Sequence, residues 1–427
     1  MHNDVAPLGR EQRKVLTASL VGTSVEFYDF FIYATAASLF FGPLFFPASS
    51  PSAQLLAAYA SLALAFIARP VGAILFGHFG DRVGRKATLV ASLLLMGGST
   101  FFIAFLPTYE DIGWTASLML CILRLGQGLG LGGEWGGAAL LAVENAPNGW
   151  RGRYGMVPQL GAPIGFITAN GVFLLLGMGL SAEQMMDWGW RIPFLGSAFL
   201  VIIGLWVRLK LTETPAFAAA LKEAPPEAVP IASVFRNHLP GVMFGTLGGI
   251  CCFAIYYITT AFLLGYGTTT LGYGRSEFLI AQIGATVFLA VGIILSGIFS
   301  DRFSQRTVLI WGCLGTLLIA GPLMKPLMDS GSLGLVFIQL SVALLCMGLA
   351  YGPLGAWLPS LFPARVRYTG ASMAFNLGAI AGGSLAPFFA QSMAERGGLL
   401  PVGLYLSACG GVSLIALLMA PRRPVEG

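Results

Sequence analysis

The sequence predicts an all-α membrane protein whose twelve transmembrane helices form two similar six-helix bundles. The first observation is composition: 56% of the 427 residues are hydrophobic and 10% are charged, whereas soluble domains carry about 25% charged residues. The second is that apolar runs of about 20 residues, the length that crosses a bilayer, recur twelve times between Val15 and Ala420. The third is an internal repeat, which divides the twelve runs into two sets of six.

The repeat is carried by charged residues in corresponding loops. The clearest repeated motif is Gly77-xxx-Asp81-Arg82-xx-Arg85, which recurs 220 residues later as Gly297-xxx-Asp301-Arg302-xxx-Arg306. A second pair is Arg153-Tyr154-Gly155 and Arg367-Tyr368-Thr369-Gly370. Duplication of a six-helix block is typical of secondary transporters.

Prolines, glycines and basic residues delimit the expected helices of the first half. The first two helices span 15–41 and 54–79, with three prolines between them, and a tight basic turn at 77–86 leads to a third that ends before Pro107. The fourth covers 120–143 and closes at Pro147, because proline cannot continue a helix. The fifth starts near Tyr154, and the sixth runs from Trp190 to about Lys210.

The second half follows the longest polar stretch. Residues 211–238 contain four prolines and are expected to be a cytoplasmic linker. Six apolar runs follow, at 239–265, 277–299, 307–328, 333–361, 369–393 and 399–420. The expected domains are thus a tail at 1–14, bundles at 15–210 and 239–420, the linker at 211–238, and a tail at 421–427. Of the 24 Lys and Arg, 18 fall in the two tails and in the alternate loops that twelve crossings place on the same side of the membrane as the tails. The positive-inside rule therefore places both termini in the cytoplasm.

The stretch Leu120–Val143 contains seven glycines, several of them four residues apart. Glycine weakens a helix in water, but small residues at this spacing let two transmembrane helices pack closely. The same stretch holds Arg124, and an arginine in a bilayer is costly and usually functional. We expect Arg124 to face an aqueous cavity and to interact with acids on another helix.

Four charged residues lie near mid-membrane depth: Glu26, Asp29, Arg69 and Arg124. At about 1.5 Å per residue, Asp29 lies roughly 20 Å from the inner end of its helix and Arg124 roughly 15 Å from the outer end of its own. The two can therefore meet near the midplane. Glu26 and Asp29 are three residues apart and are expected to share a helix face. For Arg69, lining the cavity and pairing with Glu134 both remain open.

The functional hypothesis makes Asp29 the proton carrier, with Glu26 as a second acid site and Arg124 as the partner of Asp29. A substrate carboxylate that binds Arg124 would draw it away from Asp29, which could then take up a proton. The alternative is a static ion pair that only stabilises the fold. No charge lies deep in the membrane in the second half, so proton coupling is expected in the first.

Two further groups of residues are candidates for binding and gating. Polar or amphipathic side chains at mid-membrane depth could contact substrate or could only hold helices together; they are Tyr33, Gln127, Gln159, Asn170, Tyr256, Tyr257, Trp357 and Asn376. An inner gate is expected from Glu134 and Glu144 with Arg82, Arg85 or Arg151. Asp81 and Asp301, each followed by an arginine (Arg82 and Arg302), are expected at helix ends of the opposite half, where a carboxylate meets a positive helix dipole. A solvated charged loop is the alternative.

Other chemistry is not expected. The sequence has no GxxxxGK[ST] motif, no HExxH motif and only three scattered histidines, so neither ATP hydrolysis, a metal site nor another cofactor is predicted. The six cysteines all lie in apolar runs and are expected to pack the core. The net charge of +5 follows membrane topology and does not indicate nucleic-acid binding. The expected partners are a small molecule, a proton and the lipid bilayer, and a monomer is expected.

Several motifs resemble those of a known family. The turn Gly77–Lys86 and the pattern Leu120-xxx-Arg124-xx-Gln127-Gly128-x-Gly130 resemble the major facilitator superfamily. More narrowly, five stretches resemble its metabolite:proton symporter family: Glu26–Phe30, Ala68-Arg69-Pro70, Gly132–Gly137, Trp188–Pro193 and Leu361–Ser372.

The resemblance implies a bacterial inner-membrane transporter that couples protons to uptake of a small organic acid such as shikimate, 2-oxoglutarate or citrate. Proton-coupled relatives in the superfamily use an acid on the first helix with an arginine on the fourth, and the resemblance implies the same pairing here. The alternative cargo is a zwitterionic osmolyte such as proline or betaine. Osmolyte members tend to carry a long C-terminal coiled coil, and only about seven residues follow the last helix here. A non-transporting nutrient sensor would need an added signalling domain, and an enzyme would need a catalytic set that the sequence does not show.

Overall fold

The computed structural model describes residues 10–48, 50–83, 85–132, 134–209, 230–363 and 366–420. All regular structure within these ranges is helical. Eleven of the helical segments are long and apolar enough to cross a membrane, and the shorter apolar helix Val90–Ile103 supplies the twelfth crossing. The predicted twelve-helix fold is confirmed.

The first bundle contains passes 1 to 6, several of them interrupted. In chain order they are α1 (Arg10–Ala36) with η1 (Ala37–Phe41) and α2 (Gly42–Phe45); α3 (Pro51–Val83); α4 (Arg85–Ile103); α6 (Trp114–Leu131) with α7 (Glu134–Glu144); α8 (Arg151–Gln159) with α9 (Gly161–Gly179); and α11 (Ile192–Leu209). The short helices α5 (Tyr109–Ile112), α10 (Ala182–Asp187) and η2 (Gly189–Arg191) connect them.

The second bundle contains passes 7 to 12. They are α14 (Leu239–Tyr257) with η3 (Ile258–Phe262) and α15 (Leu263–Thr269); α16 (Arg275–Arg302); α17 (Gln305–Gly315) with η4 (Thr316–Ala320) and α18 (Gly321–Met328); α19 (Leu333–Tyr351) with α20 (Leu354–Ser360); α21 (Arg367–Ala379) with η5 (Ile380–Ser384) and α22 (Ala386–Gly397); and α23 (Leu399–Met419).

Most predicted boundaries differ from the observed ones by a few residues, and three differences are described here. Pass 4 begins at Trp114, six residues before the predicted start. The turn expected at 77–86 is shorter, because α3 continues to Val83 and α4 begins at Arg85. The linker ends in a helix, α13 (Pro230–Asn237), while residues 210–229 lie outside the described ranges.

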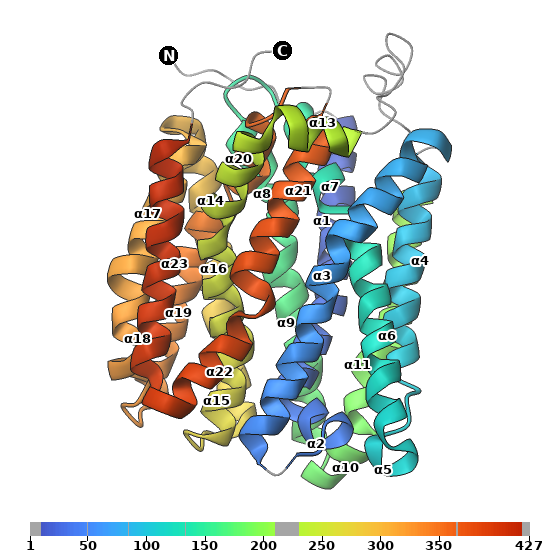
Figure 1. Cartoon of the computed structure of the whole chain (residues 1–427), viewed down its shortest axis with the longest axis vertical. Helices are drawn as coiled ribbons and strands as arrows, with labels where there is room; N and C mark the ends of the chain where they lie inside the picture. The colour runs from blue at the N-terminus through green and yellow to red at the C-terminus, as the bar shows by residue number, and fades with distance from the viewer. Residues whose placement is uncertain are drawn as a thin grey trace.

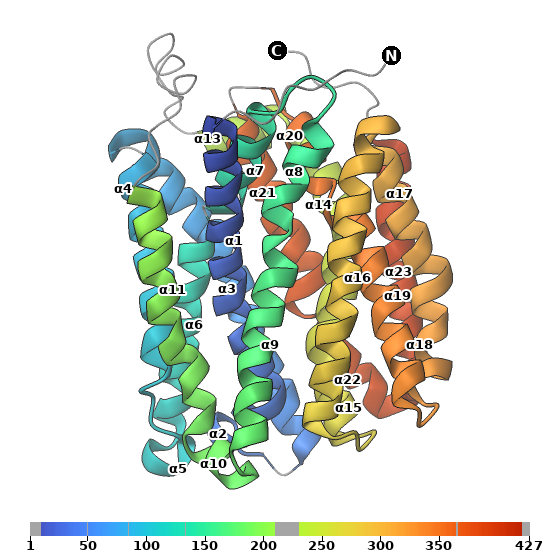
Figure 2. The ribbon, with the colours of Figure 1, turned by 180° about the vertical axis from the view of Figure 1, so that it is seen from behind.

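The two bundles stand side by side with their helices roughly parallel to the long axis (Figures 1 and 2). We call the end at which α1 begins and α23 ends the termini side, and the opposite end, where α2 and α15 lie, the far side (Figure 1). At the termini side α7 and α8 of the first bundle lie beside α20 and α21 of the second.

Glycines let passes 2 and 4 pack backbone to backbone, as their spacing in the sequence predicts. A side chain at Gly128 would overlap the backbone of Ala65, and one at Gly132 would overlap the backbone of Arg69. Both glycines are on pass 4 and both partners on α3. This packing fixes Arg69 and Arg124, which belong to the two helices, within one region of the first bundle.

Passes 1 and 7 contain π-helical segments at equivalent positions. The segment η1 starts at Ala37 and η3 at Ile258, which lie 221 residues apart, close to the 220-residue repeat of the sequence. A π-helical turn adds a residue and leaves carbonyl oxygens without their regular helical partners, and such turns are frequent at functional sites. The two segments meet on the far side of the molecule, where Ser38 Oγ lies 3.2 Å from the carbonyl oxygen of Ala261.

Candidate functional site

A small cavity lies between the two bundles. Eight of its thirteen lining residues are aromatic and two are charged; the full set is Glu26, Phe27, Phe30, Arg69, Leu131, Trp135, Ala162, Phe253, Tyr256, Tyr257, Met347, Tyr351 and Phe375. The space that the centre of a water molecule can occupy is about 20 Å³, and one water needs about 10–15 Å³ by this measure. The cavity is therefore too small for an organic molecule in this conformation.

Arg69 supplies the positive charge of the cavity wall. Its side chain is 8% exposed, and its guanidinium carbon lies 4.9 Å from the ring centre of Phe30 and 4.8 Å from that of Phe66. Its Nε atom has no hydrogen-bond partner, and the same holds for the phenol oxygens of Tyr256 and Tyr351. Buried polar atoms are nearly always paired, so these three atoms, all on cavity-lining residues, are ones that a ligand could satisfy.

Asp29 lies away from the cavity, inside the first bundle. Its carboxylate is almost fully buried and accepts hydrogen bonds from Ser197 Oγ on α11, at 2.5 Å, and from Thr100 Oγ1 on α4, at 3.3 Å. Thr100 also accepts a 2.8 Å hydrogen bond from Gln127 Nε2 on α6. Side chains from three helices besides α1 thus form a chain of hydrogen bonds to this carboxylate, and we call this chain, from Asp29 through Thr100 to Gln127 and on to the residue that it binds, the polar string.

Arg124 lies at the other end of the same string. It is completely buried, and its Nη1 atom donates a 2.8 Å hydrogen bond to Gln127 Oε1, while Nε and Nη2 have no partner. Its guanidinium carbon lies 4.0 Å from the ring centre of Tyr33 and 4.6 Å from that of Phe30. The rings stabilise the cation through their electron-rich faces.

Two predicted details are wrong for this conformation. Asp29 and Arg124 form no direct ion pair, because Gln127 and Thr100 stand between them as hydrogen-bonded intermediates. Glu26 and Asp29 do not share a face, since Glu26 lines the cavity and Asp29 contacts α4 and α11. Residues three apart on a helix differ by about 60° in direction, which is enough here to aim them at different helices.

The predicted substrate contacts divide into four sets. Tyr256 and Tyr257 line the cavity. Tyr33 and Gln127 hold Arg124, and Tyr33 also hydrogen-bonds Ser61 at 2.8 Å. Gln159 lies behind the wall, where it accepts a hydrogen bond from Trp135 Nε1 and donates one to the carbonyl of Tyr351.

The remaining three predicted contacts pack helices together. Asn170 accepts a 2.7 Å hydrogen bond from Thr35 and so joins α9 to α1. Asn376 donates to the carbonyl of Gly132 across the two bundles, and Trp357 packs on Gly248 within the second. None of the three lines the cavity.

Sequence reasoning missed most of the aromatic wall. Phe30, Trp135, Tyr351 and Phe375 were not candidates, although all four line the cavity and the Trp135 and Phe375 rings stack with centres 3.6 Å apart. Aromatic residues in an apolar run look like core residues, so only the glycine-rich context of Trp135 could have singled it out.

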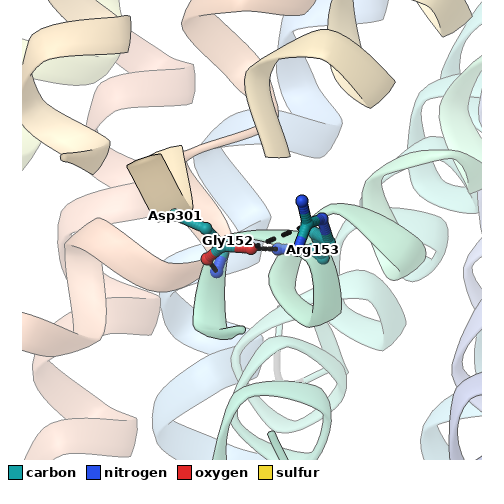
Figure 3. Close-up of polar contacts among 3 residues, drawn as sticks. All are labelled: Gly152, Arg153 and Asp301. Atoms are coloured by element: carbon teal, nitrogen blue, oxygen red, sulfur yellow. Dashed lines mark hydrogen bonds and ion pairs between the residues drawn. The ribbon is translucent and has the colours of Figure 1, made fainter. Parts of the chain in front are cut away.

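On the termini side, Asp301 of α16 closes the gap to the first bundle. Figure 3 shows its carboxylate beside the start of α8, where it accepts hydrogen bonds from the backbone N–H of Gly152 at 2.7 Å and of Arg153 at 3.2 Å. The Nε atom of Arg153 lies 3.8 Å from the same carboxylate. The position agrees with the prediction of a carboxylate at a helix end of the opposite half, and its role in gating stays a prediction.

Of the other predicted gating residues, those whose side chains the structure describes do not contact the carboxylate of Asp301. Glu144, Arg151 and Arg302 are exposed, and the ion pair with Asp301 is made by Arg153, which was not a candidate. Glu134 is buried at the start of α7. The side chains of Asp81, Arg82 and Arg85 lie outside the described residues.

The two bundles contact each other on both sides of the membrane region. On the termini side the backbones of Gly155 and Gly355 pack together, so that a side chain at Gly355 would lie 2.7 Å from the Gly155 carbonyl. On the far side the carbonyl of Ala261 accepts hydrogen bonds from Ser38 and Tyr59 of the first bundle. Contacts of this kind at both ends are those expected of an occluded conformation.

Solved structures of similar fold are transporters. The chain aligns with the proton:xylose symporter XylE, a major facilitator superfamily protein, bound to 6-bromo-6-deoxy-D-glucose, with a TM-score of 0.75 at 17% identity and coverage of 96% of each chain. A partially occluded inward-open structure of XylE from E. coli aligns with a TM-score of 0.74, covering 96% of this chain and 97% of XylE. At this identity the likeness shows the fold.

Several transporters share a higher sequence identity with this chain than these solved structures do. The inner membrane metabolite transport protein YhjE of Escherichia coli K12 is 49% identical, covering 96% of this chain and 94% of its own. The shikimate transporter of the same organism is 35% identical (96% and 95%), and the proline/betaine transporter of Salmonella typhimurium is 30% identical (97% and 85%). The sugar (and other) transporter family profile matches residues 14–237 and 231–420. The chain therefore belongs to this family of the major facilitator superfamily, whose members here are transporters and not enzymes.

Proposed function

We propose that this protein is a proton-coupled symporter that takes up a small organic acid across the bacterial inner membrane by alternating access. The observation that carries the proposal is the buried carboxylate of Asp29, which belongs to one hydrogen-bonded string with the buried guanidinium of Arg124. A buried carboxylate can bind a proton on one side of the membrane and release it on the other, and its neutral form is better tolerated inside an apolar bundle. The relatives named as metabolite and shikimate transporters support the same class of cargo.

In this proposal Asp29 carries the proton and Glu26 is the second acid. Arg69 meets the cargo carboxylate first, because it lies on the cavity wall, and the phenols of Tyr256 and Tyr351 meet polar groups at the other end of the cargo. The cargo would then touch both bundles and stabilise the occluded conformation. The protein works as a monomer, with residues 15–210 and 239–420 as its two moving bodies and both termini in the cytoplasm.

The test is uptake into proteoliposomes with shikimate as the probe, with and without an inward proton gradient. We expect the gradient to drive accumulation by the native protein. Asp29→Asn should still exchange labelled for unlabelled shikimate but should not accumulate it, since the amide cannot release a proton. Accumulation by Asp29→Asn at the native level would overturn the assignment.

A zwitterionic cargo is the second candidate, and one observation favours it. Glu26 and Arg69, of opposite charge, line the same aromatic cavity, and an aromatic cage suits a quaternary ammonium group. Thermal-shift measurements on the purified protein decide between the two. Stabilisation by shikimate, 2-oxoglutarate or citrate supports the organic acid, whereas stabilisation by betaine or proline alone supports the zwitterion.

A further inference from the structure

Phe30 contacts both buried guanidiniums of the first bundle. Its ring centre lies 4.9 Å from the guanidinium carbon of Arg69 and 4.6 Å from that of Arg124. Among the described residues it is the ring shared by both arginines. Phe30 and Arg69 line the cavity, but Arg124 does not and is completely buried. The Phe30 ring is therefore part of the wall between the cavity and Arg124.

Arg124 has hydrogen-bonding capacity that the protein leaves unused. A guanidinium has five N–H donors, and here only Nη1 donates, to Gln127, while Nε and Nη2 have no partner. Ring faces stabilise the cation but accept no conventional hydrogen bond in this geometry. A fully buried cation with unpaired N–H groups is suited to an anion that arrives from outside the protein.

We propose that Phe30 is a movable partition, and that the carboxylate of the cargo takes the place of its ring between Arg69 and Arg124. Both guanidiniums then bind the same carboxylate, Arg69 from the cavity side and Arg124 through its unpaired N–H groups. This deepens the proposed function and rests on it for the class of cargo. Phe30 is a positioning residue in this scheme, because it controls access to Arg124 and makes no polar contact itself.

The partition also links cargo binding to the proton site. Phe30 directly follows Asp29 in α1, and Arg124 is joined to Asp29 through Gln127 and Thr100. When the ring turns aside and a carboxylate reaches Arg124, the charge at one end of this string changes. The cargo thereby acts on Asp29 without a direct contact between Asp29 and Arg124.

The matched control is the neighbouring residue. Phe31 is as buried as Phe30, but its ring packs on Phe166 and Tyr256 and it does not line the cavity. Phe31→Ala therefore removes a ring of the same size from the same helix and leaves the Phe30 ring itself, which the Phe31 ring contacts edge-on with centres 5.9 Å apart. Phe30→Leu keeps most of the bulk at the partition and guards against a truncation that disturbs folding.

The experiment labels arginines with phenylglyoxal, which adds to guanidinium groups, and quantifies the adducts at Arg69 and Arg124 by peptide mass spectrometry. In the native protein Arg69 should react faster than Arg124. Phe30→Ala should raise the rate at Arg124 by about tenfold or more, since a local opening is no longer needed to expose it. Phe30→Leu and Phe31→Ala should leave that rate near the native one. Equal rates at Arg124 in Phe30→Ala and Phe31→Ala would refute the partition.

Benzoate, a planar monocarboxylate, tests the shared binding. Excess benzoate should protect Arg69 and Arg124 together in Phe30→Ala, and protection of Arg69 alone, or of neither, overturns the two-arginine site. Labelling is measured without transport, so the two proposals can fail separately. If labelling behaves as stated but no carboxylate is taken up, the proposed function fails; if uptake is proton-driven but Arg124 is equally reactive in all variants, the partition fails.

Discussion

The carboxylate of Asp301 in the second bundle accepts a 2.7 Å hydrogen bond from the backbone N–H of Gly152 in the first. Gly152 is the second residue of α8, so the carboxylate lies at the positive end of a helix dipole and uses N–H groups that the helix itself cannot pair. The contact joins the two bundles that the proposed alternating-access cycle would separate. We therefore predict that this bond breaks whenever the termini side opens.

Asp301→Ala should favour opening of the termini side. A hydrogen bond to a charged group contributes about 1.5–3 kcal/mol, so the open population should rise by about tenfold or more. The measurement is the alkylation rate of a single cysteine introduced as Met156→Cys, beside Gly297, in a background without other cysteines. Asp329→Ala is the control, because Asp329 pairs with Lys325 within one helix turn at the protein surface. Equal rates in the two variants would contradict the role of Asp301.

Gly152→Ala should disturb the same closure by size instead of charge. A Cβ there would lie 2.6 Å from the Gly297 carbonyl and 2.8 Å from Asp301 Oδ1, and such overpacking typically costs about 1–3 kcal/mol. We expect slower uptake and easier alkylation at position 156. Gly171→Ala is the matched control, since nothing lies within 4 Å of its Cβ position. An unchanged Gly152→Ala protein would mean that the backbones are not held this close.

The far side should respond in the opposite sense. The carbonyl of Ala261, in the π-helical segment η3, accepts hydrogen bonds from Ser38 Oγ at 3.2 Å and from Tyr59 OH at 3.1 Å. Ser38→Ala and Tyr59→Phe each remove one donor, worth about 1 kcal/mol, and should favour opening of the far side. Distances between spin labels on α2 and α15 would show a longer component in each variant. Distances that stay at the native values in both single variants would contradict the role of this contact.

The sequence predicts the helices well because membrane crossing imposes a strong constraint. Each apolar run must be long enough to span the bilayer and must pair its own backbone, so the number and order of the passes follow from composition alone. The position of Asp301 could also be predicted, since a carboxylate at a loop repeated in both halves has few places to pair. The exact partner could not, since no arginine was predicted for Asp301, and the ion pair is made by Arg153.

The site was harder to predict because its geometry depends on which way each helix faces. The two acids Glu26 and Asp29 are one helix turn apart, yet one points to the cavity and the other to Ser197. Arg69 and Arg124 both lie in apolar stretches of the sequence, so only the packing of the helices determines that Arg69 lines the cavity. The aromatic wall is formed by helices of both bundles, and no local sequence pattern predicts which aromatic residues of distant helices lie together.

Gln127→Leu should be the most damaging substitution of a neutral residue in the first bundle. Gln127 accepts from Arg124 at 2.8 Å and donates to Thr100 at 2.8 Å, so its loss leaves a buried guanidinium without its side-chain hydrogen bond and cuts the string to Asp29. Leaving a buried charged group unsatisfied costs about 3 kcal/mol. We expect a lower thermal midpoint together with loss of proton-driven accumulation.

The control for Gln127→Leu is Gln339→Leu. Gln339 is equally buried, but it lies in the second bundle and donates only to the carbonyl of Ala320. Its replacement should lower stability slightly and leave the proton dependence of uptake unchanged. If both variants lose stability and uptake alike, Gln127 is only a packing residue. If Gln127→Leu stays fully proton-coupled, Asp29 and Arg124 act independently, and the string between them has no part in transport.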